Sequence, residues 1–258
     1  MEKHSAGFIG GGRVVRILLT GWGRRPRPAL ESVIVADPDE AVLARLKDVV
    51  PDVQTTTEVS EAAGQDLVFL AVHPPAMSAT LEAIRPALRQ DAILISLAPK
   101  CSIAALSQAL GGFDRIARMI PNAPSAVGKG FNPVHIGPGL EAHDRAMLLN
   151  GFAPLGHCPE VPESHLEAYA ILTGMGPTYF WPALYALAEL GESFGLNREQ
   201  AVHGLTETLA GTLAVMEEGV AFDDAMDMIP VKPLGEAAEA LRQAALEKAP
   251  ALMAKIRP

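Results

Sequence analysis

Residues Ala6–Val15 read AGFIGGGRVV, an apolar run that enters three successive glycines. An apolar segment of helical length, residues 14–19, follows them, so the order is strand, tight turn, helix, as in a dinucleotide-binding unit. Gly10 can adopt the positive φ that the turn needs, and Gly12 has no side chain to block phosphates. Three glycines also make an ordinary flexible turn, but the segments that follow favour the binding unit. We predict that the cofactor is bound here by Gly10, Gly11, Gly12, Arg13 and Val14.

Strand-like and helix-like segments alternate from this turn to about residue 160, as a parallel sheet with crossover helices requires. Strands are expected over residues 32–36, 53–56, 66–72, 92–97 and 114–120. From Pro162 onward helical signals take over, with helices expected over residues 177–194, 198–217 and 235–256. The sequence therefore predicts an α/β protein, with a Rossmann-type dinucleotide-binding domain over residues 1–161 and an all-helical dimerisation and substrate domain over residues 162–258.

Composition limits the class of protein. A chain of 258 residues is long enough for two domains, and its net charge of −9 argues against nucleic-acid binding. No apolar run reaches membrane-spanning length. Cys101 and Cys158 fit a reducing compartment, so we expect a cytoplasmic protein. His157, Cys158 and His165 have no second ligand cluster beside them, and we expect no metal site.

Two loops differ in their expected roles. Gly21–Pro28, GWGRRPRP, reads as a solvated basic turn, because it should lie at the sheet edge opposite the cofactor. Asp37 follows the second strand, roughly 20 to 25 residues beyond the glycine turn, where an acid accepts hydrogen bonds from the adenosine ribose. Its carboxylate would repel a 2′-phosphate, so the sequence favours NADH over NADPH. Asp37 can also be the cap of the next helix, which Pro38 would open.

Further residues are placed near the cofactor by the loops at the carboxyl ends of later strands. The loop after residues 66–72 is stiffened by prolines, and Ser102 is a candidate N-cap beyond the next strand. The sixth strand ends in RMIPNAP, residues 118–124, whose prolines would fix the loop that holds Asn122. The residues that we predict along the cofactor path are Val72, His73, Pro74, Ala98 and Asn122.

Several motifs occur in the order and spacing of one enzyme family: GFIGGG, AV-x-P (residues 71–74), ISLA (95–98), RMIPNAP and ESHLEAYAILTGMGPTY (163–179). Together they resemble the pyrroline-5-carboxylate reductase family over residues 6 to about 220. The resemblance implies a dinucleotide domain followed by a helical domain that forms a dimer, or a larger ring of dimers. It also implies hydride transfer from NAD(P)H to the C=N bond of a cyclic imino acid, as in proline biosynthesis.

The helical region read alone also suggests a dimer. Leu205, Leu209, Leu213 and Met216 would form an apolar face, and small Gly204, Ala210 and Gly211 would allow close helix approach. Three helices cannot bury this surface by themselves. It must be covered by a second copy of the chain, or the helices must fold back on the first domain. We expect a homodimer or higher homo-oligomer.

The chain departs from the family pattern at several positions. Ala98, Pro99 and Lys100 replace Ala-Ala-Gly, and His73 replaces a lysine. The family's late Ser-Pro-Gly-Gly-Thr-Thr loop, which helps to hold the substrate carboxylate, has no counterpart, and residues 228–235 read MIPVKPLG instead. We predict that Lys232 in this segment has taken over recognition of the acidic substrate.

An imine reductase needs few reactive side chains, because it must mainly place the iminium carbon beside the nicotinamide and exclude water. The catalytic candidates are Asn122, Glu163, Thr173 and Lys232. Glu163 would orient Thr173 or the substrate nitrogen, or would only stabilise a helix start. Two alternatives stay open: a carbonyl or hydroxyacid oxidoreductase with Lys232 as proton donor, and a non-catalytic dinucleotide-binding protein.

Overall fold

A computed structural model describes residues 4–24 and 30–257 of the chain. Contacts between residues divide the chain into two compact units. The first comprises Met1–Met175 with Leu252–Pro258, and the second comprises Gly176–Ala251. Residues 25–28 of the predicted basic turn lie outside the described residues.

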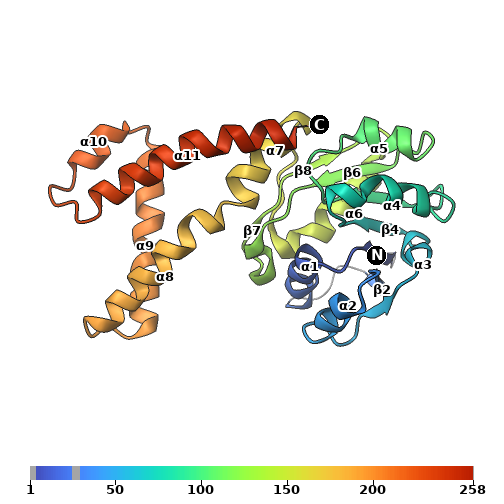
Figure 1. Cartoon of the computed structure of the whole chain (residues 1–258), viewed down its shortest axis with the longest axis horizontal. Coiled ribbons are helices and arrows are strands. Elements are labelled where there is room, and N and C mark those ends of the chain that lie inside the picture. The colour runs from blue at the N-terminus through green and yellow to red at the C-terminus, as the bar shows by residue number, and fades with distance from the viewer. Residues whose placement is uncertain (1–3, 25–29, 258) are drawn as a thin grey trace. The chain divides into compact units, whose positions relative to one another are not determined.

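The first unit is built on a sheet that has seven strands within the described residues, in the order β3-β2-β1-β4-β5-β6-β8 (Figure 1). The strands are β1 His4–Ile9, β2 Leu30–Ala36, β3 Gln54–Thr56, β4 Leu67–Leu70, β5 Ile93–Ser96, β6 Ile116–Met119 and β8 Val134–Ile136. Neighbouring strands run parallel from β3 to β6. This order is that of a Rossmann dinucleotide-binding domain, with the topological switch between β1 and β4, and the predicted fold class is confirmed.

The last strand of this sheet differs from the all-parallel expectation. β8 pairs antiparallel with β6, with Met119 opposite Val134. The chain between them forms the 3₁₀ helix η2 (Ala123–Val127) and the short strand β7 (Gly130–Phe131), which pairs with β9 (Gly156–His157). A parallel return needs a crossover, usually an α-helix, and this segment contains none.

Helices cover both faces of the sheet. They are α1 Arg13–Gly23, α2 Glu40–Lys47, α3 Val59–Ala63, α4 Met77–Ile84, α5 Ile103–Ala109 and α6 Ala142–Phe152, with the 3₁₀ helices η1 Pro74–Ala76 and η3 Ala153–Leu155. Alternate residues of a strand point to opposite faces, and the core divides accordingly. Phe69 packs with buried residues of α1, α2 and α6, whereas its neighbour Leu70 packs with those of α3, α4 and α5.

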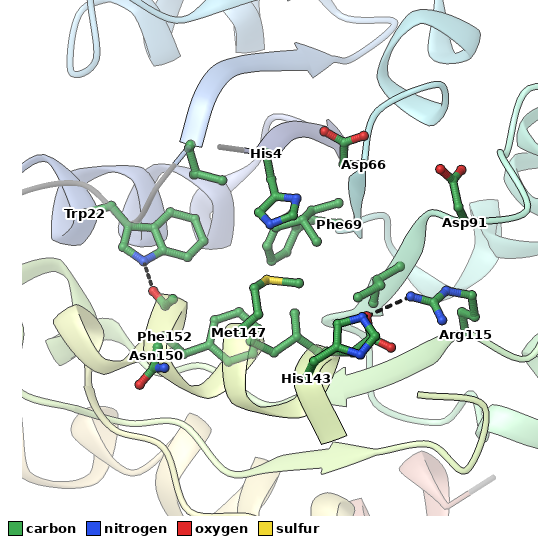
Figure 2. A pocket seen from close by; sticks show the side chains of 16 residues that line it. His4, Trp22, Asp66, Phe69, Asp91, Arg115, His143, Met147, Asn150 and Phe152 are labelled. Carbon is green, nitrogen blue, oxygen red and sulfur yellow. Dashed lines mark hydrogen bonds and ion pairs between the residues drawn. The ribbon is translucent and has the colours of Figure 1, made fainter. Parts of the chain in front are cut away.

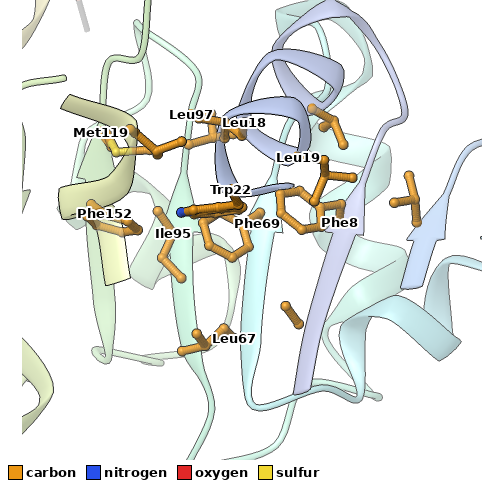
Figure 3. Packing of buried hydrophobic residues seen from close by; sticks show 14 of the residues in the cluster. Phe8, Leu18, Leu19, Trp22, Leu67, Phe69, Ile95, Leu97, Met119 and Phe152 are labelled. Atoms are coloured by element: carbon orange, nitrogen blue, oxygen red, sulfur yellow. The ribbon is translucent and has the colours of Figure 1, made fainter. Parts of the chain in front are cut away.

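Helix α1 is longer than expected and accounts for part of the predicted basic turn. Gly21 and Trp22 are helical, so the predicted turn Gly21–Pro28 starts too early. The indole of Trp22 is buried against Phe69, with ring centroids 5.7 Å apart (Figure 3). Its Nε1 donates to the Gly151 carbonyl at 2.9 Å. Phe69 also stacks on Phe8 of the neighbouring strand at 4.4 Å. Burial of Trp22 in this aromatic cluster stabilises the helical conformation beyond Gly21.

The boundary between the units lies later than the expected division after residue 161. The 3₁₀ helix η4 (Glu163–His165), helix α7 (Leu166–Tyr169) and the π-helix η5 (Ala170–Gly174) all belong to the first unit. The reason is burial: Leu166 and Ala170 form a small apolar cluster with Ile120 at the end of β6, and Ile256 packs against it.

The regular elements of the second unit are all helices in the part that the structure describes. It contains α8 Pro177–Ser193, α9 Arg198–Glu217, α10 Phe222–Asp227 and most of α11 Gly235–Ile256. Pro177 stands in the first turn of α8, and Asn197 and Gln200 form the predicted capping box of α9. Many large apolar side chains of this unit are exposed in the single chain, among them Phe180, Tyr185, Phe194, Leu213, Met216, Leu241 and Leu246.

Candidate cofactor and substrate site

The glycine turn lies at the carboxyl end of β1, beside the topological switch. Gly10 has φ +95°, and a Cβ there would come within 2.8 Å of the Ala71 carbonyl oxygen at the end of β4. A Cβ on Gly12 would meet nothing within 4 Å. Gly12 caps α1 without a side-chain hydrogen bond, and the first turn of α1 contains no acidic residue. The Gly10 amide donates to the Ala36 carbonyl and the Gly11 amide to Asp37, so the donors left for an anion are the amides at the start of α1. With the positive end of that helix, they fit a dinucleotide pyrophosphate.

The structure brings Asp37 to this turn. Its Oδ2 accepts a hydrogen bond from the Gly11 amide at 2.8 Å, and its Oδ1 accepts one from the Asp39 amide at 2.9 Å. The side-chain cap of α2 is Asp39, which accepts from the Ala41 amide, so the capping alternative for Asp37 is wrong. Each carboxylate oxygen can accept a second bond, which leaves Asp37 able to bind ribose hydroxyls.

The predicted cofactor-binding residues after β4 and β5 differ in how far their side chains are exposed to a ligand. His73 and Pro74 are exposed at the start of η1, and Val72 is partly buried. Ala98 is buried, with its side chain packed in the core of the α3, α4 and α5 face. Ala98 can therefore contribute only its backbone to a ligand. Ser102 caps α5, as predicted, by accepting from the Ala105 amide at 3.2 Å.

Asn122 is buried where β6 ends, and both ends of its amide are bonded. Its Oδ1 accepts from the Phe131 amide at 3.1 Å, and its Nδ2 donates to the Thr173 carbonyl at 3.3 Å. Its backbone amide donates to Oδ1 of Asn132, which also accepts from the Ser125 hydroxyl. The structure thus joins two predicted residues, Asn122 and Thr173. The Thr173 hydroxyl donates to the Tyr169 carbonyl at 2.8 Å and keeps its lone pairs for an acceptor role.

Glu163 has a partner that the sequence did not suggest. Arg118 is fully buried on β6, and its guanidinium donates to Glu163 at 3.0 Å and to Glu167 at 2.5 Å. Glu163 also accepts from the Ile103 amide at the start of α5 at 2.7 Å. The Glu163 carboxylate therefore binds the buried guanidinium of Arg118, and the expected contact between Glu163 and Thr173 is not observed. The signal for Arg118 was a charged residue inside an otherwise apolar strand.

The loop between β5 and α5 is held by the same cluster. The Lys100 amide donates to Glu167 Oε1 at 3.3 Å. Cys101 follows, and burial raises the pKa of its thiol, against the opposing charges of Arg118 and Lys100. A raised pKa makes Cys101 a poor nucleophile near neutral pH. Neither Cys101 nor Cys158 is in a disulfide.

Lys232 lies in the second unit, exposed in the segment between α10 and α11. Its backbone carbonyl accepts from the Gly235 amide at 3.1 Å. Lys232 and the glycine turn belong to different units.

A cavity of about 890 Å³ lies at the other edge of the sheet, where the strands begin (Figure 2). Its floor includes Trp22 and Phe69, and helix α6 contributes His143 and Met147. Its acids are already engaged; Asp144, for example, binds Arg115 at 2.8 Å. The cavity is opposite the glycine turn, so it does not belong to the dinucleotide site.

The described part of the chain has neither a metal-binding cluster nor a membrane-spanning helix. No group of three or more His, Cys, Asp or Glu side chains in residues 4–24 and 30–257 is arranged to hold a metal ion. Within the same residues, no helix is long and apolar enough to cross a membrane.

Comparison with known proteins gives two family matches on this chain. Residues 5–100 match the family described as NADP oxidoreductase coenzyme F420-dependent, and residues 163–256 match pyrroline-5-carboxylate reductase dimerisation. The chain is 27% identical to pyrroline-5-carboxylate reductase of Escherichia coli over 244 residues, 94% of this chain and 90% of that protein. It is 25% identical to the Methanosarcina acetivorans enzyme of the same name over 230 residues, 89% of this chain and 85% of that one.

A solved structure has the same fold. The pyrroline carboxylate reductase of Plasmodium falciparum, determined with NADP bound, superposes with a TM-score of 0.71 at 21% identity, covering 99% of this chain and 95% of that one.

Proposed function

Because the chain belongs to the pyrroline-5-carboxylate reductase family, we propose that it reduces the C=N bond of 1-pyrroline-5-carboxylate or a related cyclic imino acid with NAD(P)H. The observation that carries this proposal is the order of the two family matches on one chain, with a nucleotide-binding half followed by a dimerisation half. The open glycine turn at the end of β1 supplies the matching geometry. The proposed reaction is a step of proline formation.

The chain's own groups serve this reaction mainly by position. When bound, NAD(P)H supplies the hydride, and the protonated imine is already electrophilic. Asn122 and Thr173 are joined by a hydrogen bond beside the end of β6, so we propose that they shape the wall against which the imine ring lies. The Thr173 hydroxyl can accept a hydrogen bond from the imine N–H. We propose that Glu163, held by Arg118, is a positioning residue rather than a catalytic one.

We propose NADH as the preferred cofactor. Asp37 stands beside Gly11, and its carboxylate would repel a 2′-phosphate. The residues that follow it, Pro38, Asp39 and Glu40, offer no arginine to bind such a phosphate.

We also propose that Lys232 binds the substrate carboxylate in place of the family's hydroxyl-rich loop. Pro230 and Pro233 bracket it in a stiff connection, and a preordered segment loses less entropy when ligand binds. An ammonium is a mobile point charge that can reach carboxylates of differing shape.

A homodimer or larger homo-oligomer is proposed through the second unit. Its exposed apolar side chains, such as Leu213 and Met216 on α9, need a partner surface, and the matched family region is a dimerisation region. Light scattering after gel filtration tests this, since a monomer at micromolar concentration would contradict it. A cytoplasmic location remains a prediction that rests on the use of two free cysteines.

The experiment for the function is oxidation of NADH and NADPH with a panel of compounds: 1-pyrroline-5-carboxylate, other cyclic imines, 2-keto acids and 3-hydroxy acids. We expect turnover of the cyclic imino acid. The names of the relatives do not favour the carbonyl-oxidoreductase alternative, and turnover of keto acids alone would reinstate it. Cofactor binding without any turnover would indicate a non-catalytic protein.

A further inference from the structure

The loop between β5 and α5 contains an unusual backbone conformation. Lys100 has φ +78°, and it is the one non-glycine residue with a positive φ in the part of the chain that the structure describes. The left-handed region is unfavourable for a residue with a Cβ, and glycine is the residue that adopts it without cost. The related family has glycine at this position, so the lysine here costs stability that the family pattern avoids.

Surrounding contacts hold this conformation in place. The Lys100 amide donates to Glu167, and the Ile103 amide donates to Glu163. Both carboxylates are fixed by the buried Arg118. The loop is therefore fastened on both sides of Lys100 by one ionic cluster. Strain that is maintained in this way is typical of functional positions.

The side chain of Lys100 is free to meet a ligand. It is exposed, and its ammonium has no ion pair or hydrogen bond with any residue in the ranges 4–24 and 30–257. The cluster behind it contains two carboxylates and one guanidinium, yet the ammonium is not paired with either carboxylate. If Lys100 served only to neutralise the cluster, its ammonium would be expected to pair with one of these carboxylates.

The strand order places Lys100 at one end of the cofactor. The pyrophosphate belongs at the glycine turn of β1, and Asp37 at the end of β2 marks the adenosine side. The second nucleotide must then extend the other way, over the ends of β4, β5 and β6. Lys100 follows β5, between the loops that contain His73 and Asn122, which is the nicotinamide side where hydride transfer takes place.

We propose that Lys100 is a specificity-determining residue that pairs with the carboxylate of the imine substrate. This inference rests on the proposed function. Unlike Lys232, Lys100 lies on the same unit as the glycine turn, so its placement at the cofactor edge does not depend on how the two units are arranged. The lysine adds a positive charge where the family has an uncharged glycine. The ligand that it would bind is a small cyclic carboxylate.

The test compares two substrates, 1-pyrroline-5-carboxylate and 1-pyrroline, which is the same ring without the carboxylate. For Lys100→Met we expect kcat/KM with the carboxylate substrate to fall at least tenfold, while kcat/KM with 1-pyrroline changes less than threefold. Lys100→Arg should keep most of the preference. Lys47→Met, an exposed lysine at the end of α2, is the matched control and should change neither value.

Lys100→Gly separates charge from folding. It removes the ammonium and also the strain, so its melting temperature should equal or exceed that of the unmodified protein while the carboxylate preference is lost. Equal losses on both substrates, or an unchanged preference in Lys100→Met, would overturn the proposal.

If the unmodified protein turns over neither imine, the proposed function fails, and binding still decides the role of Lys100. L-Proline, which has the same ring carboxylate, is then titrated calorimetrically into protein saturated with NAD⁺ or NADP⁺. We expect at least tenfold weaker binding by Lys100→Met. Equal affinity, or no binding by the unmodified protein, would overturn the proposal.

Discussion

Arg118 and Glu163 form an ion pair of 3.0 Å that ties strand β6 to the segment before α7, across 45 positions of sequence. Because Glu163 also accepts from the Ile103 amide, the pair fixes the start of α5 at the cofactor edge. The buried guanidinium makes this acid part of the scaffold that supports the site.

Glu163→Gln should therefore lower stability more than it changes chemistry. Loss of the charge weakens the bonds to a buried guanidinium, and we expect the free energy of unfolding to fall by about 1 to 3 kcal/mol in urea denaturation. Glu160→Gln is the control, because Glu160 pairs with Arg145 at the surface and should cost at most about 1 kcal/mol. Unchanged stability with a large fall in kcat would instead make Glu163 catalytic.

Gly12→Val should remove dinucleotide binding and keep the fold. A Cβ there meets nothing within 4 Å, so the branched side chain would project into the space that the pyrophosphate needs. We expect the Kd for NADH, measured by fluorescence titration, to rise at least about tenfold, or about 1.4 kcal/mol. Gly10→Val is the contrast, since φ +95° and the Ala71 carbonyl should make it destabilise the fold itself by more than about 1 kcal/mol. Unaltered NADH affinity in Gly12→Val would remove the cofactor site from this turn.

Asp37→Ser should narrow or reverse the preference for NADH. The substitution removes the negative charge that opposes a 2′-phosphate, so the Kd for NADPH should fall while that for NADH rises. Asp39→Ser keeps a capping oxygen on α2 and should leave both constants unchanged. A clear NADPH preference in the unmodified protein would show that Asp37 does not select the cofactor.

Lys232→Met should raise the KM for the acidic substrate and leave cofactor affinity and dimerisation alone. Loss of a charge-assisted hydrogen bond is worth about 1.5 to 3 kcal/mol in kcat/KM. Steady-state kinetics decide the role: an unaltered kcat/KM assigns Lys232 to the surface, and a collapse of kcat at constant KM favours a proton donor.

Asp66 makes part of the stability dependent on pH. Burial alone would raise the pKa of its carboxyl, but hydrogen bonds from Ser5 and the charge of Arg89 together hold that pKa below its usual value of 3.8. The folded state therefore binds this proton less readily than the unfolded state, and the stabilisation is present above the unfolded pKa and lost as the pH falls through the folded one. Thermal melts of Asp66→Asn should show a smaller loss of stability below about pH 4 than the unmodified protein. Parallel pH profiles would contradict this.

The sequence by itself determined the elements whose signals are local. The strand, glycine turn and helix of residues 6–19 follow from apolar spacing and from the conformational freedom of Gly10. The bounds of α9 and α11 follow from the capping pair Asn197 and Gln200 and from helical periodicity. Such patterns depend on neighbours within a few positions, so they can be read from the chain without its fold.

Only the tertiary structure decided which distant groups meet. In the folded chain Glu163 pairs with Arg118. The side-chain amide of Asn122 bonds with Phe131 and Thr173, and β8 pairs antiparallel with β6. The fold also holds Lys100 in the left-handed region through Glu167, against its own local preference. The physical reason is that a buried charge or amide must satisfy its hydrogen bonds with whatever the fold brings near, and no local periodicity encodes a partner 45 to 67 positions away.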